Sequence, residues 1–383
     1  MTIHNDTRRD FLKAGAAAAL AAGVPREALA RKRSVSRSDI LKIGLVLGGA
    51  NHSQNMWARL INCVPNENNI PYTPRRTGML ITHVWSVIPE WAEAFAKRFG
   101  VETVMKRFDG MVGKVDGIII DAFFGTPYNH RLAEPYLAAR VPVFVNRPFS
   151  DSVGKAKRMA ELAGKYKTPV MTGSSFEHLE FTMEVRNRFP GNAVTGYEAW
   201  NAASDFYSHG IHGLWLAYAC FGGGMETVAH RTESWIKGGG TTIVEYADRG
   251  NGPFTGTIFD WSTERYLCAV RVKGSNQIYG FGPADWDQYM WIHMLQRMEM
   301  MFEHGDMPDT YDQMVEKTAM FTAAFRSIIR EGGNPVSLKE LDEDWAIGPP
   351  WGHSGNPTME EQKVYAALFG EEKGELRPDR TFG

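Results

Sequence analysis

The 383-residue chain has little cysteine. It contains three, Cys63, Cys220 and Cys268, and none lies in a CxxC pair. Neither a zinc ribbon nor a disulfide framework is therefore indicated. In an oxidising compartment three cysteines allow one disulfide, with one thiol left over.

The chain also lacks an excess of charge and a long apolar run. Its formal net charge is −2, so it offers no basic field that would attract nucleic acid or an anionic membrane. After the first thirty residues no stretch approaches the roughly 20 apolar residues that a membrane-spanning helix needs. We therefore predict no nucleic-acid partner and no membrane span in the mature form. The remaining chain is too long for one small core, which favours two domains.

The first thirty residues have the three parts of an export signal. Arg8 and Arg9 precede a short Ala-rich run over 14–24, and Ala28-Leu29-Ala30 has the small-residue spacing of a cleavage site. The paired arginines mark the twin-arginine version. We predict a signal peptide over 1–30, a twin-arginine translocase as its partner, and a periplasmic or extracytoplasmic location. An Ala-rich first helix of the domain is the alternative.

The next part of the chain alternates short apolar runs with helical patterns. Such alternation predicts βαβ units and a parallel sheet, and we assign it to a domain over 38–175. The predicted strands are 41–48, 79–85, 115–122, 141–145 and 169–173, and the predicted helices are 51–62, 90–99, 129–139 and 152–166.

The pattern changes near residue 192 to longer strands with polar turns. This predicts an antiparallel sheet of the α+β type in a domain over 176–340, followed by a tail over 341–383 with a short helix. The fold class is thus α/β plus α+β. The predicted strands are 193–202, 226–237, 241–247, 254–261 and 266–275, with helices over 211–221, 286–303 and 311–330.

Four short stretches follow one another in a familiar order. They are Thr126-Pro127-Tyr128-Asn129-His130, Asn146-Arg147-Pro148, residues 169–176, and Ser208-His209-Gly210-Ile211-His212 with Gly222-Gly223-Gly224 after it. Together they resemble the T-P-x-x-x-H, E-K-P and D-x-G-x-H segments of the glucose-fructose oxidoreductase / inositol dehydrogenase / rhizopine-catabolism (Gfo/Idh/MocA) family. The first is one residue shorter here.

The resemblance implies a Rossmann-like first domain that binds NAD or NADP, and a second sheet that binds a small carbohydrate and forms a homo-oligomer. The family's lysine and histidine flank the reacting carbon, and Arg147 and His212 stand at those positions. By the same resemblance, the predicted cofactor contacts include Thr126, Pro127, His130, Asn146 and Arg147.

The chain departs from the dinucleotide pattern at the first strand. A G-x-G-x-x-G loop allows close approach of the pyrophosphate to a helix N-terminus. Here Gly48 and Gly49 can make the turn, but no later glycine follows. We predict that these glycines, with Asn51, His52 and Ser53, contact the cofactor. Helix capping by Asn51 or Ser53 is the alternative.

Two further positions differ from the family pattern. Ser86 ends the second strand where an acidic residue usually binds the ribose, and a serine there admits the 2′-phosphate of NADP. Arg147 replaces a lysine. Because arginine stays protonated, it can orient the substrate or stabilise an alkoxide or enolate but cannot relay a proton. A salt bridge at the domain junction is its alternative role.

His212 is the best general acid/base, since an imidazole titrates near neutral pH. A buried structural histidine is the alternative. We add His209 and Asp205 to the predicted catalytic set. Asp205, His209 and His212 also have a D-x3-H-x2-H spacing, so a metal site remains open, although we predict none. Asp205 can instead contact sugar hydroxyls.

Three functions fit these residues. The first is hydride transfer between a sugar or polyol carbon and a tightly held NAD(P). The second keeps the fold without the nicotinamide and acts as a lyase, hydrolase or isomerase on a keto-sugar whose enolate Arg147 stabilises. The third is a carbohydrate-binding or assembly protein without catalysis. Fold alone does not separate them.

Overall fold

The computed structural model describes the chain from residue 40 onward, with gaps, and all structural statements concern the described residues. The predicted signal peptide, Gly49 and Asn51 lie outside them. The described ranges are 40–48, 52–63, 77–189, 193–202, 205–236, 238–250, 252–261, 266–284, 288–350 and 359–376.

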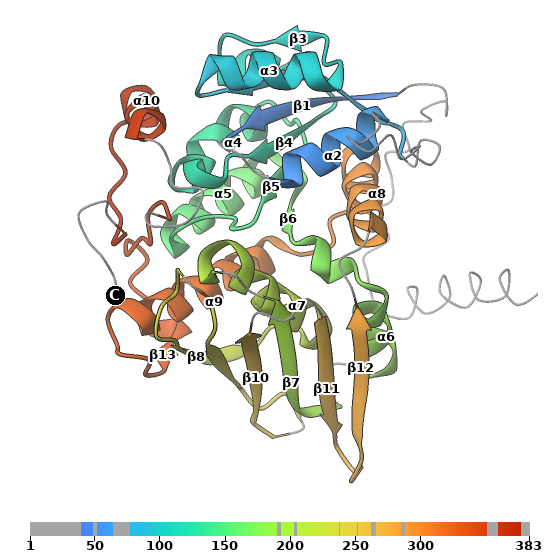
Figure 1. The fold of residues 1–383 in the computed structure, drawn as a ribbon, viewed down its shortest axis with the longest axis vertical. Coiled ribbons are helices and arrows are strands. Elements are labelled where there is room, and N and C mark those ends of the chain that lie inside the picture. The colour runs from blue at the N-terminus through green and yellow to red at the C-terminus, as the bar shows by residue number, and fades with distance from the viewer. Residues whose placement is uncertain are drawn as a thin grey trace, which may run out of the picture. The chain divides into compact units, whose positions relative to one another are not determined.

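The first sheet has six parallel strands in the order β3-β2-β1-β4-β5-β6 (Figure 1). The chain starts in the middle at β1, winds outward to β3, and returns to β4 on the other side of β1. The direction of winding thus changes between β1 and β4, which is the switch point of the sheet, and open parallel sheets bind ligands at the carboxyl ends of the strands at such a point. The predicted parallel sheet is confirmed, with strands β1 Leu41–Leu47, β2 Met79–Ser86, β3 Thr103–Val104, β4 Gly117–Asp121, β5 Val143–Asn146 and β6 Val170–Gly173.

Both faces of this sheet are buried. Because successive side chains of a strand point to opposite faces, Ile43, Leu45 and Leu47 of β1 enter one hydrophobic core and Val46 enters the other. The first core continues into the second sheet, whereas the second core lies under α4 and α5. The helices are α2 His52–Asn62, α3 Pro89–Phe99, α4 Asn129–Ala138 and α5 Val153–Tyr166.

The second sheet has seven strands in the order β12-β11-β7-β10-β9-β8-β13. It is mixed, because β7 and β10 pair in parallel while the other pairs are antiparallel. Helix α7 carries the chain from β7 to β8, and the two antiparallel steps through β9 then give β10 the direction of β7. The strands are β7 Val194–Ala202, β8 Met225–Arg231, β9 Thr241–Tyr246, β10 Phe254–Trp261, β11 Tyr266–Val272, β12 Ile278–Ala284 and β13 Val336–Ser337.

The prediction of one strand over 226–237 is wrong at its carboxyl end, because β8 stops at Arg231. The hydroxyl of Thr232 donates to the carbonyl of Gly239 and accepts a bond from the Ser234 amide. These hydrogen bonds turn the chain at Thr232. The strand prediction had counted this threonine as a β-forming residue.

Among the described elements, the two-residue strands β3 and β13 had no prediction, and neither did two longer elements. Helix α6, Glu180–Arg188, is largely polar and presents few apolar residues at helical spacing. Strand β12 contains Gly280, Gly282 and Pro283, which weaken a strand pattern. Its place at the sheet edge explains why it tolerates them.

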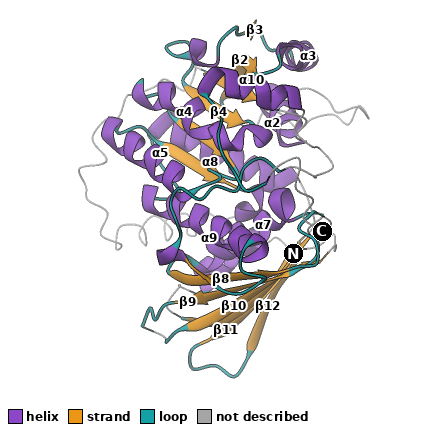
Figure 2. Ribbon diagram, turned by 90° about the vertical axis from the view of Figure 1, so that its left-hand side faces the viewer, coloured by secondary structure: helices purple, strands orange, loops and turns teal. Residues whose placement is uncertain are grey.

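Helices cover one face of the second sheet. Helix α7, Ile211–Phe221, contacts β7 and β10, and α9, Tyr311–Ile329, contacts β8. Figure 2 shows no described helix on the opposite face. Helix α8, Gln288–His304, follows the second sheet in the chain and packs against α2 and β6 of the first domain. None of the described helices has the length and hydropathy needed to cross a bilayer.

One buried carboxylate fixes the start of α7 to the sheet. The Asn201 side-chain amide donates to Asp260 Oδ1 at 2.8 Å and to the carbonyl of His209 at 3.0 Å. Burial raises the pKa of Asp260 to about 7, although hydrogen bonds from Asn201 and Thr242 act in the opposite direction. β7, β10 and the turn before α7 are thereby held together.

The raised pKa of Asp260 makes stability depend on pH. Between about pH 4 and pH 7 only the unfolded state releases this proton, so stability falls as pH rises, by about 1.4 kcal/mol per unit. We expect Asp260→Asn to remove this slope, so that the stability of the variant rises relative to that of the native chain between pH 4.5 and pH 7.5. Urea unfolding at both pH values measures the free energy of unfolding. Glu161→Gln, at an exposed site, is the control, and an equal change at both pH values for Asp260→Asn would contradict the prediction.

Candidate functional site

Polar side chains gather where the parallel strands end. Asp121 ends β4, Asn146 and Arg147 follow the body of β5, and Ser174 follows β6; all four are buried. The Asn146 amide donates to Asp121 Oδ1 at 2.6 Å. This is the edge at which open parallel sheets bind their ligands, so the site lies where the topology requires.

Arg147 reaches from the end of β5 to helix α7. Its side chain is 4% exposed, and its Nη2 donates to His212 Nε2 over 3.1 Å. Burial lowers the pKa of Arg147, while the carboxylates of Asp121 and Asp205 raise it. A guanidinium keeps its protons even so, and therefore places a fixed positive charge beside the imidazole.

His212 is held at both ring nitrogens. Its Nδ1 lies 2.6 Å from Ser174 Oγ, and the ring of Phe176 packs against it edge-on at 4.4 Å between centroids. Because a guanidinium only donates, Nε2 accepts from Arg147. In the neutral ring Nδ1 then carries the proton and donates to Ser174. The imidazole is thus set with a basic nitrogen toward Arg147.

Asp205 organises the turn before α7. Its Oδ1 accepts from the Ser208 amide at 2.6 Å, and its Oδ2 accepts from the Ser208 hydroxyl and from His209 Nδ1, the latter at 2.5 Å. Asp205 thereby caps the π-turn η5, Phe206–Gly210, and orients the His209 ring. The carboxylate that the family pattern has at the position of Ser208 is supplied three residues earlier.

The spacing of Asp205, His209 and His212 does not give a metal-ligand set. The nitrogens of His212 face Arg147 and Ser174, and His209 pairs with Asp205. Within the described ranges no His, Cys, Asp and Glu side chains converge as metal ligands.

Gly48 marks a close approach at the switch point. Its amide donates to the carbonyl of Asp121, and a Cβ at Gly48 would lie 2.6 Å from the Cα of Ala122. Helix α2 begins at His52, shortly after this turn, so its N-terminus lies at the same edge of the sheet. His52 and Ser53 lie in its first turn, but their side chains are outside the described set.

The ribose end of the site differs from the usual pattern. Ser86 is buried, and its hydroxyl accepts from the Ile88 amide at 3.3 Å. β2 therefore ends without a carboxylate for the ribose. At Gly48 there is no side chain to obstruct a pyrophosphate, whereas binding at the ribose must rely on groups other than a carboxylate of β2.

The C-terminal segment covers the loop after β4. This loop is the 3-10 turn η3, Phe123–Tyr128, in which Thr126 Oγ1 donates to the Phe123 carbonyl and Pro127 is buried. Helix α10, Met359–Phe369, stacks Tyr365 on Tyr128 at 5.0 Å. Helix α10 thereby packs on η3, the turn that contains the predicted cofactor contacts Thr126 and Pro127.

His130 lies in the first turn of α4, and its Nε2 is 3.5 Å from Glu372 Oε1. Burial, together with the nearby Lys155 charge, lowers the pKa of His130 to about 3. The side chain is therefore neutral, and it contacts the C-terminal segment.

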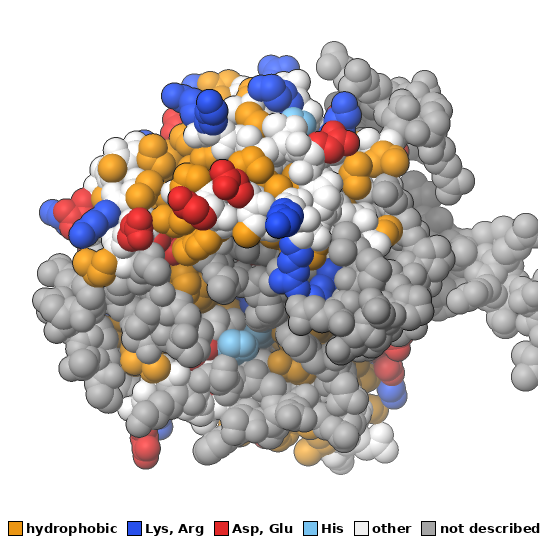
Figure 3. Space-filling model, turned by 45° about the horizontal axis from the view of Figure 1, so that its top comes forward, with side chains coloured by type: hydrophobic (Ala, Val, Ile, Leu, Met, Phe, Trp, Pro, Cys, Tyr) orange, Lys and Arg blue, Asp and Glu red, His pale blue; other side chains and the backbone are white. Residues whose placement is uncertain are grey.

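The surface around this edge carries no field of one sign. Figure 3 shows acidic and basic side chains interspersed with apolar ones among the described residues of the face it displays. This agrees with the net charge of −2.

Comparison with known proteins defines the class and then the family. Residues 46–174 match a family model described as an oxidoreductase family with an NAD-binding Rossmann fold, and residues 7–25 match the twin-arginine translocation signal. The first sheet is thus an NAD-binding Rossmann domain of the oxidoreductase class. The matching model is that of the Gfo/Idh/MocA family, so the predicted resemblance and the predicted cofactor class are confirmed for this domain.

Solved structures share the whole fold at low identity. An oxidoreductase from Agrobacterium radiobacter in complex with NAD+, L-tartaric acid and magnesium is 17% identical, with a TM-score of 0.60 over 78% of this chain and 99% of its own. A putative myo-inositol dehydrogenase from Sinorhizobium meliloti is 16% identical, and scyllo-inositol dehydrogenase from Lactobacillus casei with NAD(H) and scyllo-inositol is 13% identical. Both have a TM-score of 0.60 and the same two coverages. No curated protein matches the chain by sequence.

Three residues of this site had no role in the sequence prediction. They are Asp121, Ser174 and Tyr266, whose buried phenol has a raised pKa beside Arg147. Asp121 and Ser174 each end or directly follow a buried strand, and that position is the signal by which they could have been found.

Gly48 offers a direct test of the close approach. We expect Gly48→Ala to destabilise the protein by about 1–3 kcal/mol, because the new methyl group overlaps the backbone at Ala122. Thermal unfolding of the full chain measures the effect. The control is Gly280→Ala on β12, where a Cβ meets nothing within 4 Å. Equal melting temperatures for the two variants would contradict the close approach.

Proposed function

We propose that the protein is an exported oxidoreductase that transfers hydride between a carbon of a sugar or polyol and NAD or NADP. The observation that carries this proposal is the contact between Arg147 and His212 at the carboxyl edge of a Rossmann sheet. This contact places the positive charge of Arg147 and a basic nitrogen of His212 side by side at the carboxyl edge of the sheet.

When bound, the nicotinamide takes a hydride from the substrate carbon or returns one to it. The protein's part is to hold the dinucleotide and the substrate oxygen. The amides near Gly48 and the start of α2 hold the pyrophosphate. Since Ser86 supplies no carboxylate, the ribose is held without the usual charged contact.

His212 acts at the reacting hydroxyl. When the substrate oxygen takes over the hydrogen bond that Arg147 gives to Nε2, this nitrogen is free to accept the hydroxyl proton as the carbon is oxidised and to give it back in reduction. Arg147 donates to the same oxygen and stabilises the alkoxide, a role that needs a permanent charge. Ser174 fixes the tautomer that this transfer requires.

Asp205 is a positioning residue in this proposal. It holds His209, whose side chain is 32% exposed, at the open side of the site. There His209 contacts other hydroxyls of the substrate. Two of the similar structures hold tartaric acid and scyllo-inositol, which are small polyhydroxylated molecules, and this supports the substrate class.

The location and assembly follow from two other features. The signal over 7–25 supports a periplasmic or other extracytoplasmic location. The open face of the second sheet supports a homo-oligomer formed through that sheet. The domain boundaries at 38–175 and 176–340 belong to the same proposal.

Replacing both arginines of the signal tests the export route. We expect Arg8→Lys with Arg9→Lys to leave the protein in the cytoplasm, because the pair is what marks the twin-arginine pathway. Cell fractionation and immunoblotting measure this. The control is Arg31→Lys with Arg33→Lys, which lie beyond the predicted cleavage site. Unchanged export of the first variant would contradict the route.

The keto-sugar enzyme is the second candidate. Ser86 in place of the ribose acid and Arg147 in place of lysine favour it, because both changes weaken the nicotinamide chemistry while an enolate would suit Arg147. The two candidates differ in whether the folded protein carries a nucleotide.

The deciding experiment denatures the purified full-length protein and assays the released NAD(H) and NADP(H). A polyol and sugar screen then follows the nicotinamide absorbance. We expect stoichiometric nucleotide, and a turnover that falls at least ~100-fold in His212→Asn while its nucleotide content stays the same. His304→Asn, on the surface of α8, is the control.

The opposite results separate the candidates. If no nucleotide is released and none binds by calorimetry, the oxidoreductase proposal fails. Activity of the native protein toward a keto-sugar, lost in His212→Asn, would then support the second candidate. Unchanged turnover in His212→Asn would remove that residue from the mechanism.

A further inference from the structure

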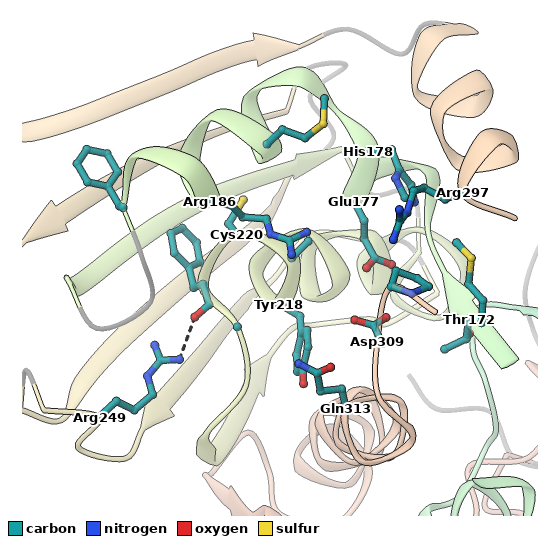
Figure 4. Close-up of a pocket in the computed structure, with 17 residues that line it drawn as sticks. Thr172, Glu177, His178, Arg186, Tyr218, Cys220, Arg249, Arg297, Asp309 and Gln313 are labelled. Carbon is teal, nitrogen blue, oxygen red and sulfur yellow. Dashed lines mark hydrogen bonds between the residues drawn. The ribbon is translucent and has the colours of Figure 1, made fainter. Parts of the chain in front are cut away.

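A second cavity lies at the other end of α7. Its volume is about 490 Å³, within the range of small-molecule sites. Figure 4 shows the side chains that line it. They come from β6, the short turn η4 (Ser175–His178), α6, the end of α7, the β9–β10 turn, α8, and the segment leading into α9: Met171, Thr172, Glu177, His178, Met183, Arg186, Phe189, Tyr218, Ala219, Cys220, Phe221, Gly222, Arg249, Arg297, Pro308, Asp309 and Gln313.

This cavity is separate from the Arg147–His212 site. His212 lies in the first turn of α7, whereas the cavity uses the last turn and the residues after it, from Tyr218 to Gly222. At 1.5 Å per residue the two lie roughly 9 Å or more apart along the helix. Neither Arg147 nor His212 lines the cavity.

One buried cation serves both carboxylates of the cavity wall. Lys317, which is fully buried, contacts Glu177 Oε2 at 2.6 Å and Asp309 Oδ2 at 2.7 Å. Burial acts to lower the pKa of Lys317, but the attraction of these two carboxylates raises it overall. The wall also contains Arg186, Arg249 and Arg297, of which Arg297 lies 3.4 Å from Asp306 Oδ2, so its cations outnumber its carboxylates.

Two of those cations have unused donors. Arg249 Nη1 donates to the carbonyls of Phe221 and Gly223, while its Nε and Nη2 are buried and have no hydrogen-bond partner in the described part of the chain. Arg186 extends from α6 into the middle of the cavity (Figure 4). A guanidinium edge with free N–H groups matches the geometry of a carboxylate or a phosphate.

The local field agrees with this reading. His178 is pushed to a pKa of about 3, first by burial and then by the charges of Lys317 and Arg297. His178 is therefore neutral, and the charges that act at its ring, after burial, are those of cations. Thr172 Oγ1 is buried without a hydrogen-bond partner in the described residues, so this hydroxyl can donate to an oxygen of a ligand.

We propose that this cavity is a second binding site, for a small organic oxyanion on a hydroxylated carbon chain. Arg186 and Arg249 bind the carboxylate or phosphate, and Thr172 and Gln313 bind hydroxyls. Sugar acids and sugar phosphates share this chemistry. The site goes beyond the proposed hydride transfer, because it involves none of the residues assigned to that reaction.

Isothermal calorimetry on the full-length protein tests the site with three probes: glucuronate, glucose 6-phosphate and glucose. We expect saturable binding of at least one anion, and no binding of glucose that depends on Arg186. Arg186→Gln should weaken anion binding by about 10-fold or more, since it removes a charged hydrogen bond worth about 1.5–3 kcal/mol. Which anion binds more tightly identifies the source of the oxyanion.

Two further variants complete the experiment. Arg249→Lys keeps the charge but loses the fork, and should also weaken binding. Arg131→Gln removes an exposed arginine of α4 outside the cavity and should leave binding unchanged. Absence of saturable binding by both anions would overturn the proposal, as would binding that Arg186→Gln leaves intact.

The nucleotide content separates this test from that of the proposed function. Arg186→Gln should release the same amount of NAD(P) as the native protein, and His212→Asn should bind the anion as the native protein does. Failure of one proposal therefore leaves the other measurable.

Discussion

The structure depends on one buried polar contact, in which Arg147, which follows β5 of the first sheet, meets His212 of α7, a helix that packs on the second sheet. Removing a guanidinium from water is costly, and nearby carboxylates recover part of that cost. Here burial lowers the pKa of Arg147, and the carboxylates of Asp121 and Asp205 oppose part of that effect. The junction between the two sheets is thus polar at the site and apolar around it, since one hydrophobic core runs from the first sheet into the second.

The site shows how a family pattern can change while its geometry persists. The aspartate of the family segment is a serine here, yet Asp205 brings a carboxylate to the same turn from three residues upstream. The glycine-rich loop is shortened to Gly48 and Gly49, yet the close approach at Ala122 remains. Backbone geometry has been kept where side chains have been exchanged. At Ser86 nothing described replaces the lost carboxylate.

Much of the fold could be predicted because buried parallel strands are continuous apolar runs, as in 117–121 and 143–146. β12 and α6 could not, because their stability comes from the strands and helices they pack against and not from their own patterns. At the site, His212 and Arg147 were predicted from the family resemblance together with their residue types. Ser174 was not, because a hydroxyl acquires its role only when folding brings it to an imidazole. The cavity was also beyond the sequence, since Arg186 and Arg249 lie far apart in the chain and line one cavity only in the folded protein.

The turn η4 lies between the two cavities and has a side chain in each. Ser174, its cap, contacts His212, while Glu177 accepts from the Ser174 amide at 2.8 Å and contacts Lys317. A molecule that shifts this turn from one side shifts the wall of the other. Binding free energies joined in this way are reciprocal, so whatever factor one ligand applies to the affinity of the second is returned by the second to the first. Binding at the site near the start of α7 and binding at the cavity near its end are then coupled to each other.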